Sequence, residues 1–376
     1  MNNPYSAETL IKRQASLTAL LAQHGFDAIA LNAGPSQTYF SGLHFHIMER
    51  PVVLLLAPRQ APVLVLPGFE KGKTEGLGFE LRTLTYGEDP SLWQASFDQA
   101  AGQLGTAKRI AVEGLHLRVM ELRYLEAAFP GASFEAAEGL LGQLRMRKDA
   151  GELAAMQRAA EIAEAALEAT LRTVQLGQTE KQVAGELIRQ LYAHGCDPAL
   201  PFQPIVAAGP NSANPHATVS DRKLQKGDLL LFDWGASVDS YFSDLTRTFA
   251  VGELDEELKR IYEIVKLANQ AGRQAAKPGA ACAAVDEAAR EVIEDSGYGA
   301  YFTHRTGHGL GLEAHEEPYM RAGNAMKLEP GMTFTVEPGI YLDGRGGVRI
   351  EDNVVITKDG SRSLSSFSRE LRVIGD

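Results

Sequence analysis

LLLFDWGASVDSYFSDLTRTFAV, residues 229–251, is the stretch that decides the fold, because two apolar segments in it each carry an aspartate. LLLFDWG (residues 229–235) has the pattern of a buried strand, yet it ends with Asp233 where an apolar residue is expected. YFSDLTRTFAV (residues 241–251) sets Asp244 among aromatic and β-branched residues, which favour strands. The pair predicts a hairpin that places two carboxylates in a core.

A second pair of segments repeats this arrangement nearer the C-terminus. MTFTVEPG (residues 332–339) ends a predicted strand with Glu337, and VRIEDNVVI (residues 348–356) carries Glu351 after a turn at residues 343–347. A single buried carboxylate is most simply explained by a salt bridge or a turn cap. Four of them exceed the two nearby arginines, Arg247 and Arg349. The excess negative charge predicts bound divalent cations.

A histidine cluster supplies a further metal donor. HRTGHGLGLEAHEEP (residues 304–318) contains three of the nine histidines, in a glycine-rich segment whose backbone can approach a ligand closely. Carboxylate oxygens with one imidazole favour a hard ion such as Mn²⁺, with Co²⁺, Fe²⁺ and Zn²⁺ as alternatives. Two such ions about 3.5–4 Å apart could polarise a substrate carbonyl.

The second half of the chain also contains an internal repeat. Each repeat is predicted as two helices followed by a strand with an acidic residue. Gly177, Val183 and Gly195 have counterparts 102 positions later, which are Gly279, Val285 and Gly297. Gly227, Asp233 and Gly235 have counterparts 104 positions later, which are Gly331, Glu337 and Gly339.

The first 145 residues show a different pattern, with short strands and helices in alternation. After an opening helix, apolar runs predict strands at residues 27–31, 52–57, 63–66, 81–86 and 109–112, and helices near 93–104 and 117–128. The charged stretch RMRKDAGE (residues 145–152) leads into a predicted helix at 153–173. We therefore expect an α/β chain of two domains, residues 1–145 and 146–376.

Composition excludes several classes of protein. A length of 376 residues suits two domains, and a net charge of −11 without a basic cluster argues against nucleic-acid binding. Two cysteines cannot form a disulfide framework and favour a reducing compartment. The first helix lacks the apolar core of a signal peptide, and no apolar run approaches the ~18 residues of a membrane span. A cytoplasmic location without a membrane partner is expected.

The second half resembles the pita-bread metallopeptidases, which include methionine aminopeptidase, aminopeptidase P and the Xaa-Pro dipeptidases (prolidases). The resemblance covers about residues 147–374, and six motifs carry it: NPH (214–216), FDWG (232–235), SDLTRT (243–248), HGLGLEAHE (308–316), EPG (337–339) and RIED (349–352). It implies a pita-bread α+β domain with pseudo-two-fold symmetry. Residues 1–145 resemble the creatinase-type domain that precedes the catalytic domain of prolidases, and methionine aminopeptidases generally lack such a domain.

The same resemblance implies the residues of the site. Two divalent ions would be held by five ligands, with Asp244 and Glu351 bridging: Asp233, Asp244, His308, Glu337 and Glu351. Five residues would take part in catalysis: Glu337 as general base or proton shuttle, His216 and His315 on the tetrahedral intermediate or the substrate carboxylate, His304 in the proline pocket, and Arg349 on that carboxylate or orienting Glu351. For Arg349, a purely structural ion pair with a bridging carboxylate is an alternative.

The resemblance favours a homodimeric Xaa-Pro dipeptidase, whose substrate is a small peptide with proline in the second position. Aminopeptidase P, acting on longer peptides, is the first alternative. A creatinase-like amidinohydrolase or a binding module is the remote one, since such relatives have typically lost metal ligands. In a dipeptidase a loop must limit substrate length, and SGLHFHIMERP (residues 41–51) offers His44, His46 and Arg50.

Overall fold

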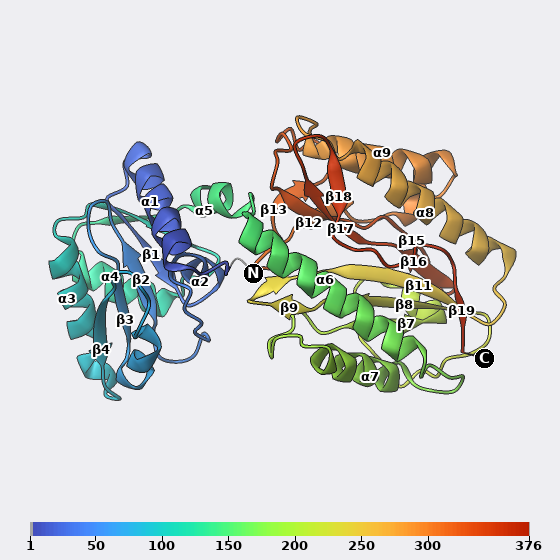
Figure 1. Ribbon diagram of the computed structural model, residues 1–376, viewed down its shortest axis with the longest axis horizontal. Coiled ribbons are helices and arrows are strands. Elements are labelled where there is room, and N and C mark those ends of the chain that lie inside the picture. Colours follow the sequence, from blue (N-terminus) through green and yellow to red (C-terminus); the bar gives the residue numbers. More distant parts are fainter. Residues whose placement is uncertain (1–2, 376) are drawn as a thin grey trace. The chain divides into compact units, whose positions relative to one another are not determined.

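The computed structural model describes residues 3–375, which form two compact units: Asn3–Arg145 and a second unit that begins at Met146. Figure 1 labels the helices and strands of both units. Across the described residues, no helix combines the length and the apolar character that crossing a membrane requires.

The N-terminal unit is built on a mixed six-stranded sheet with the strand order β4-β3-β2-β1-β5-β6. The central strand β1 pairs with β2 in antiparallel and with β5 in parallel orientation. Strands β1, β2 and β3 are buried along their whole length, which explains the unbroken apolar runs that predicted them. The six strands are β1 (Ala28–Asn32), β2 (Val53–Leu56), β3 (Val63–Pro67), β4 (Arg82–Tyr86), β5 (Arg109–Val112) and β6 (Ser133–Ala136).

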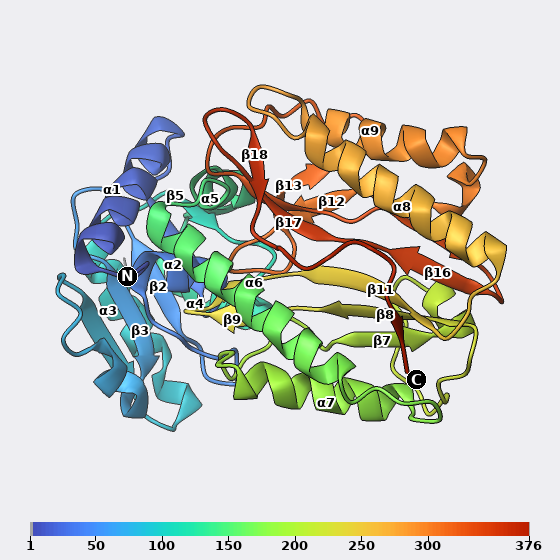
Figure 2. The ribbon, with the colours of Figure 1, turned by 45° about the vertical axis from the view of Figure 1, so that its right-hand side comes forward.

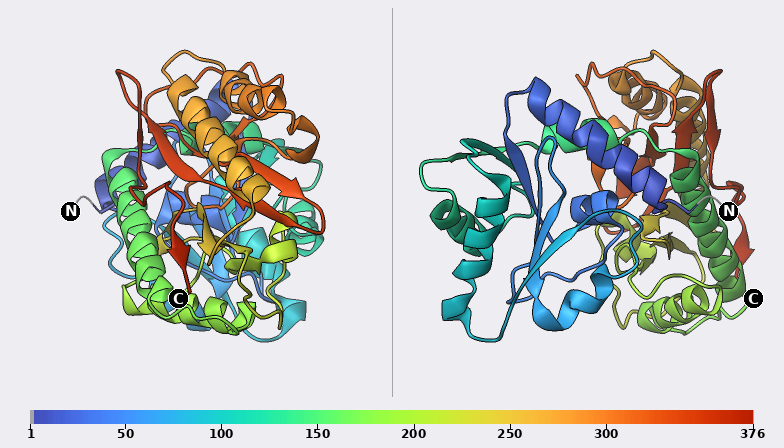
Figure 3. Two further views of the ribbon diagram at one scale, coloured as in Figure 1. Left: turned by 90° about the vertical axis from the view of Figure 1, so that its right-hand side faces the viewer. Right: turned by 60° about the vertical axis from the view of Figure 1, so that its left-hand side comes forward.

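Helices cover both faces of this sheet, as the right-hand view of Figure 3 shows. Phe97 of α3 and Leu125 of α4 enter the core on one face, and α1 packs with α2 and α5 on the other. The sequence missed α2, α5 and β6, because the short α2 buries polar residues and β6 is partly exposed. The five helices are α1 (Ala7–Gln23), α2 (Pro35–Ser41), α3 (Gln94–Leu104), α4 (Val119–Ala128) and α5 (Glu138–Arg145), with 3₁₀ turns η1 (Gly68–Thr74) and η2 (Pro90–Leu92).

The C-terminal unit consists of two similar halves, each with a helix pair and a sheet. The first half has α6 (Ala150–Leu171) and α7 (Glu180–Ala193) beside a sheet of order β19-β11-β8-β7. β8 pairs with β11 through seven residues in antiparallel register, so the predicted hairpin is observed. The strands are β7 (Ile205–Ala208), β8 (Asp228–Trp234), β11 (Leu245–Val251) and β19 (Val373–Ile374), with η3 (Gly209–Ala213) after β7.

The second half has α8 (Glu256–Ala275) and α9 (Cys282–Asp295) beside a sheet of order β13-β12-β14-β17-β18. Figure 2 shows the strands of this unit flanked by the two helix pairs, α6 with α7 and α8 with α9. The strands are β12 (Gly307–Gly309), β13 (Glu316–Met320), β14 (Thr333–Val336), β17 (Asp352–Ile356) and β18 (Ser361–Ser363), and η4 (Gly299–Tyr301) precedes β12.

The internal repeat corresponds to this pseudo-symmetry. The order β7-β8-β11 in the first sheet matches β12-β14-β17 in the second. Four of the repeated glycines are needed because their backbones lie in the left-handed region: φ is +84° and +80° at Gly177 and Gly279, and +89° and +91° at Gly227 and Gly331. The predicted α/β chain with a pita-bread domain is confirmed.

Two predicted strands are interrupted just before their acidic residue. The strand expected at residues 241–251 is divided into β10 (Tyr241–Phe242) and β11, and Asp244 lies between them. The strand expected at 348–356 is divided into β16 (Gly346–Arg349) and β17, with Glu351 between them. In each half a small hairpin interrupts the larger one, β9 (Ser237–Val238) with β10 and β15 (Gly339–Leu342) with β16. Both acids therefore lie at breaks in the strands.

Helix α6 begins earlier than predicted, inside the charged stretch. The Asp149 side chain accepts hydrogen bonds from the backbone N–H groups of Gly151 and Glu152, and the Glu152 carboxylate accepts one from the backbone N–H of Asp149. This capping box starts the helix at Ala150, whereas the sequence pattern predicts a start at residue 153.

Candidate metal centre

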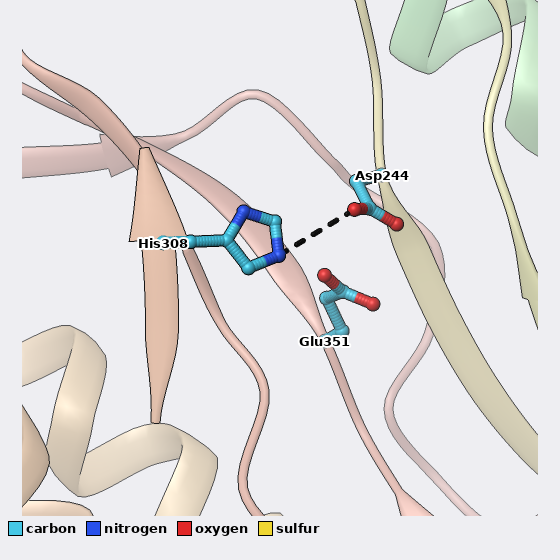
Figure 4. A group of neighbouring side chains, drawn as sticks. All are labelled: Asp244, His308 and Glu351. Atoms are coloured by element: carbon cyan, nitrogen blue, oxygen red, sulfur yellow. Dashed lines mark ion pairs between the residues drawn. The ribbon is translucent and has the colours of Figure 1, made fainter. Parts of the chain in front are cut away.

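Asp244, His308 and Glu351 converge in the core of the C-terminal unit (Figure 4). One ligand atom from each lies within 4.8 Å of the other two, and all three residues are buried. His308 lies in β12, Asp244 immediately precedes β11 and Glu351 immediately precedes β17. A backbone bridge between Thr246 and Glu351 brings the two sheets together at this point.

The other two predicted ligands border this group. Glu337 follows β14, and its Oε1 lies 3.1 Å from Nε2 of His308, whereas Asp244 Oδ2 lies 3.7 Å from the same nitrogen. Asp233, near the end of β8, directs its Oδ2 to Arg349. The structure thus gathers all five residues in one region, with three of them in the closest group.

Burial dominates the electrostatics of the acids. It raises the pKa of Asp233, Asp244 and Glu351, and the neighbouring carboxylates raise the pKa of Asp244 and Glu351 further. Burial also acts on Glu337, but the hydrogen bond and charge of His308 outweigh it and lower its pKa to about 2. Ionising all four acids together therefore requires a compensating positive charge.

The donor set fits a divalent cation. Asp233 Oδ1 is buried and lacks a hydrogen-bond partner among residues 3–375, and an orphaned buried oxygen is costly unless something binds it. Among residues 3–375, Arg349 is the one arginine that pairs with any of these four acids, and Arg247 pairs with Asp352. Several carboxylate oxygens with one imidazole form the ligand set that hard or intermediate divalent ions prefer.

His308 is held in the orientation that a ligand needs. Its Nδ1 lies 3.1 Å from the Gly309 carbonyl, so Nδ1–H donates there and Nε2, which faces the acids, becomes the ligand atom once it releases its proton. The flanking glycines allow this placement, because a Cβ on Gly307 would lie 1.9 Å from the Thr335 carbonyl oxygen. Gly307 therefore permits the backbone of β12 to approach the neighbouring strand β14 closely.

Arg349 connects two of the acids and is itself buried. Its Nη2 donates to Asp233, and its Nε donates to Oγ1 of Thr246 at 3.1 Å. Thr246 in turn donates to Oε2 of Glu351 at 2.6 Å. Of the roles considered for Arg349, orienting the acids agrees with these contacts better than binding a substrate carboxylate.

Tyr341, in β15, is a site residue that sequence reasoning missed. Its hydroxyl accepts from Nη1 of Arg349 at 2.9 Å and donates to Nε2 of His304 at 2.8 Å. His304 Nδ1 lies 2.7 Å from the Arg305 carbonyl, which makes Nε2 the acceptor, and burial lowers the pKa of His304. Burial raises the pKa of Tyr341 to about 12, so the phenol keeps its proton.

His315 and His216 are the solvent-accessible histidines of the site. The His315 ring lies 4.0 Å from the His308 ring, centroid to centroid. Partial burial is the main reason that the pKa of His315 falls to about 4, and the charge of Arg305 contributes. Both side chains can therefore reach a molecule that enters from solvent.

A second polar group supports the ligands from behind and was also missed. Asn353 accepts from the Asp244 N–H at 3.1 Å and donates to the Asp244 carbonyl. Asn269 donates to the carbonyls of Val336 and Ile350 at 2.9 and 3.1 Å, and these residues precede Glu337 and Glu351. Buried amides therefore fix the backbone next to three of the acids.

The candidate loop at residues 41–51 belongs to the N-terminal unit. Arg50 pairs with Glu49 and Glu88, and the His44 ring lies edge-on to Tyr5 with a centroid separation of 5.7 Å. His46 is exposed. The roles of these residues in limiting substrate length stay predictions.

A pseudo-symmetric pita-bread domain with a buried group of carboxylates and an imidazole defines a class of metal-dependent hydrolases. The family model of metallopeptidase family M24 matches residues 154–358, and the model of the creatinase/prolidase N-terminal domain matches residues 13–147. The chain belongs to metallopeptidase family M24 and is a metallopeptidase. The expected family resemblance is confirmed.

Similar proteins cover nearly the whole chain. An Xaa-Pro dipeptidase of Lactobacillus delbrueckii subsp. lactis is 35% identical over 357 residues, which are 94% of this chain and 96% of that protein. A dipeptidase from Pyrococcus horikoshii OT3 has a TM-score of 0.90 at 36% identity and covers 96% of this chain and 100% of its own. An X-Pro aminopeptidase from Thermotoga maritima has a TM-score of 0.85 at 31% identity, covering 96% and 99%.

Proposed function

We propose that the protein is an Xaa-Pro dipeptidase (prolidase) that uses two divalent metal ions, with Mn²⁺ as the expected ion. The group of four acids and His308, all buried or half-buried, carries the proposal of a metal centre, together with the orphaned Asp233 oxygen and the single arginine paired to the acids in the described part of the chain. The preference for Xaa-Pro dipeptides is supported by the names of the relatives.

The metal ligands in this proposal are Asp233, Asp244, His308, Glu337 and Glu351, with Asp244 and Glu351 shared between the ions. When bound, the ions would polarise the substrate carbonyl and activate water. The chain's own residues hold the donors in place: Arg349 orients Asp233 directly and Glu351 through Thr246.

Three histidines take roles toward the substrate. His216 and His315 are accessible from solvent, and the low pKa of His315 keeps its imidazole neutral at pH 7. His315 in that form, and His216, donate hydrogen bonds to the oxygen that gains charge during hydrolysis or to the substrate carboxylate. His304, held by Tyr341, lines the proline pocket, and Glu337 moves the proton.

The discriminating experiment compares Leu-Pro and Met-Pro with a Leu-Pro-X tripeptide, each with Mn²⁺, Co²⁺ and Zn²⁺. A dipeptidase should give the higher kcat/KM on the dipeptides. Faster cleavage of the tripeptide would replace this proposal with aminopeptidase P activity. The similarity to the Thermotoga X-Pro aminopeptidase supports that alternative.

We also propose that the chain is a homodimer in which the N-terminal domain, residues 1–145, limits substrate length for the catalytic domain, residues 146–376. Replacing His44, His46 and Arg50 together with alanine should raise KM for Leu-Pro and leave the metal content unchanged. An unchanged KM would exclude these residues from substrate recognition. Metal analysis of protein purified without chelator tests the remote alternative, because a creatinase-like protein or a binding module should carry no metal.

A further inference from the structure

A basic cavity of about 460 Å³ lies in the C-terminal unit, between the end of α8 and the segment that joins β17 to β18. Its lining includes three cationic side chains and one carboxylate, from Arg273, Lys277, Arg362 and Asp359. None of these residues belongs to the candidate metal centre.

Arg273 is fixed in place, yet part of its guanidinium is free. Its Nε donates to Oδ1 of Asn269 at 2.8 Å and lies 3.5 Å from Oδ2 of Asp352, and Ser361 donates to its carbonyl at 3.3 Å. Its two Nη nitrogens have no acceptor among the residues that the structure describes. A pre-oriented, half-buried guanidinium with free donors is suited to an oxyanion.

The surrounding charge also favours an anion. Asp352 already pairs with Arg247 at 2.8 Å and with Arg369 at 2.6 Å, so three guanidiniums share one carboxylate. Burial and the two other arginines lower the pKa of Arg273, although Asp352 opposes them. A bound anion would offset this surplus of positive charge.

Lys277 and Arg362 extend the cationic surface at the mouth of the cavity. Both are exposed, and Arg362 contacts an uncharged partner, Oε1 of Gln157, at 2.9 Å. Asp359 opposes an anion, but it is exposed and its charge is screened by water.

We propose that this cavity binds a phosphoryl group, either free inorganic phosphate or the phosphate of a small monoester. Three cations from separate segments suit an anion that has several oxygens and two negative charges better than they suit a ligand with a single carboxylate. The volume falls in the range of about 300–1,000 Å³ typical of small-molecule sites, so it leaves room for an organic group beside the phosphate. The proposal does not depend on the peptide that the enzyme cleaves.

Calorimetric titration of the full-length protein with sodium phosphate and with adenosine 5′-monophosphate tests the site, with sodium chloride at matched ionic strength as the blank. The Lys277→Gln/Arg362→Gln variant should bind either probe at least about tenfold more weakly than the wild type. The matched control, Lys259→Gln/Arg189→Gln, removes two charges whose partners lie on their own helices and should bind as the wild type does.

The two probes distinguish the sources of the phosphoryl group. Binding of phosphate alone identifies the free ion, and tighter binding of the nucleotide identifies a monoester, and both outcomes support the site. Equal affinity in the wild type and the Lys277→Gln/Arg362→Gln variant would place the phosphate elsewhere, for instance on the metal ions, and would overturn the proposal. Absence of binding to the wild type would overturn it as well.

Discussion

Arg349 donates through Nη2 to Oδ2 of Asp233, and the other oxygen of this aspartate, Oδ1, is left without a hydrogen-bond partner in the described part of the chain. The arginine thus holds one carboxylate oxygen and leaves the other available for a cation. Through Thr246 the same side chain also restrains Glu351.

Replacing Arg349 with lysine should lower metal affinity and kcat/KM by about 10–100-fold, because supports of metal ligands have effects of this size. Lysine keeps the positive charge but cannot reach Asp233, Thr246 and Tyr341 together as the guanidinium does. Arg345→Lys is the control, since Arg345 lies in the turn between β15 and β16 and pairs with the exposed Asp255. Wild-type metal affinity in Arg349→Lys would show that charge alone is sufficient.

Asp244→Asn should bind less metal and lose activity, because it removes one of the two ligands proposed to be shared. Metal content by mass spectrometry is the direct measurement, and Asp343→Asn, in the turn after β15, is the control. Mn²⁺ should also raise the Tm of chelator-treated wild type, and each bound ion at 100 times its Kd should add on the order of 3 kcal/mol to the free energy of unfolding. A wild-type metal content in Asp244→Asn would contradict the proposed ligand set.

Tyr341→Phe should destabilise the protein by about 1–3 kcal/mol, since it leaves Nη1 of Arg349 and Nε2 of His304 without their shared partner. It should also raise KM for Leu-Pro and leave the metal content nearly unchanged, because His304 then loses its fixed orientation. Tyr301→Phe, an exposed tyrosine in η4, is the matched control. Urea unfolding and steady-state kinetics measure the two effects separately.

Asp352→Asn should cost about 3–5 kcal/mol of stability at pH 7, because it leaves the buried Arg247 and the half-buried Arg369 without their carboxylate. Burial acts to raise the pKa of Asp352, but Arg247 and Arg369 outweigh it and hold the pKa below the ordinary value of 3.8. A lowered pKa stabilises the fold above the unfolded-state pKa and loses this effect as the pH falls below it. The difference between wild type and variant should therefore be equal at pH 7 and pH 5. A difference that shrinks already between pH 7 and pH 5 would contradict the assignment.

The structure shows why some site residues could be recognised in the sequence. Asp233 and Glu337 stand out because each ends an apolar strand, and His308 stands out through its glycine-rich neighbours. Such residues break a local pattern, and a broken pattern is visible without knowing the fold.

Residues that fit their local pattern were missed. Tyr341 lies in GIYL, where an aromatic residue is what a buried strand requires, and its polar role depends on contacts with His304, which precedes β12, and with Arg349 of β16. Asp352 follows Glu351 directly, yet its partner Arg247 is 105 residues away, so the sequence could not assign that pair. The broken strands were missed for the same reason, because the small hairpins contact segments distant in sequence: β9 and β10 pack on α6, and β15 and β16 contact η3.

His315→Ala and His216→Ala should keep the metal content of the wild type and lose roughly 10²–10³ in kcat, because a donor to a developing oxyanion acts in the transition state. Neither is proposed as a ligand, and both are accessible to a substrate. His194→Ala is the control, since His194 caps the end of α7 and bonds the Gln190 carbonyl at 2.8 Å. Metal analysis and kcat on Leu-Pro should be measured on the same preparation. A loss of metal in His315→Ala would reassign this residue as a support for His308, whose ring it contacts. An unchanged kcat/KM in either variant would remove that histidine from the catalytic mechanism.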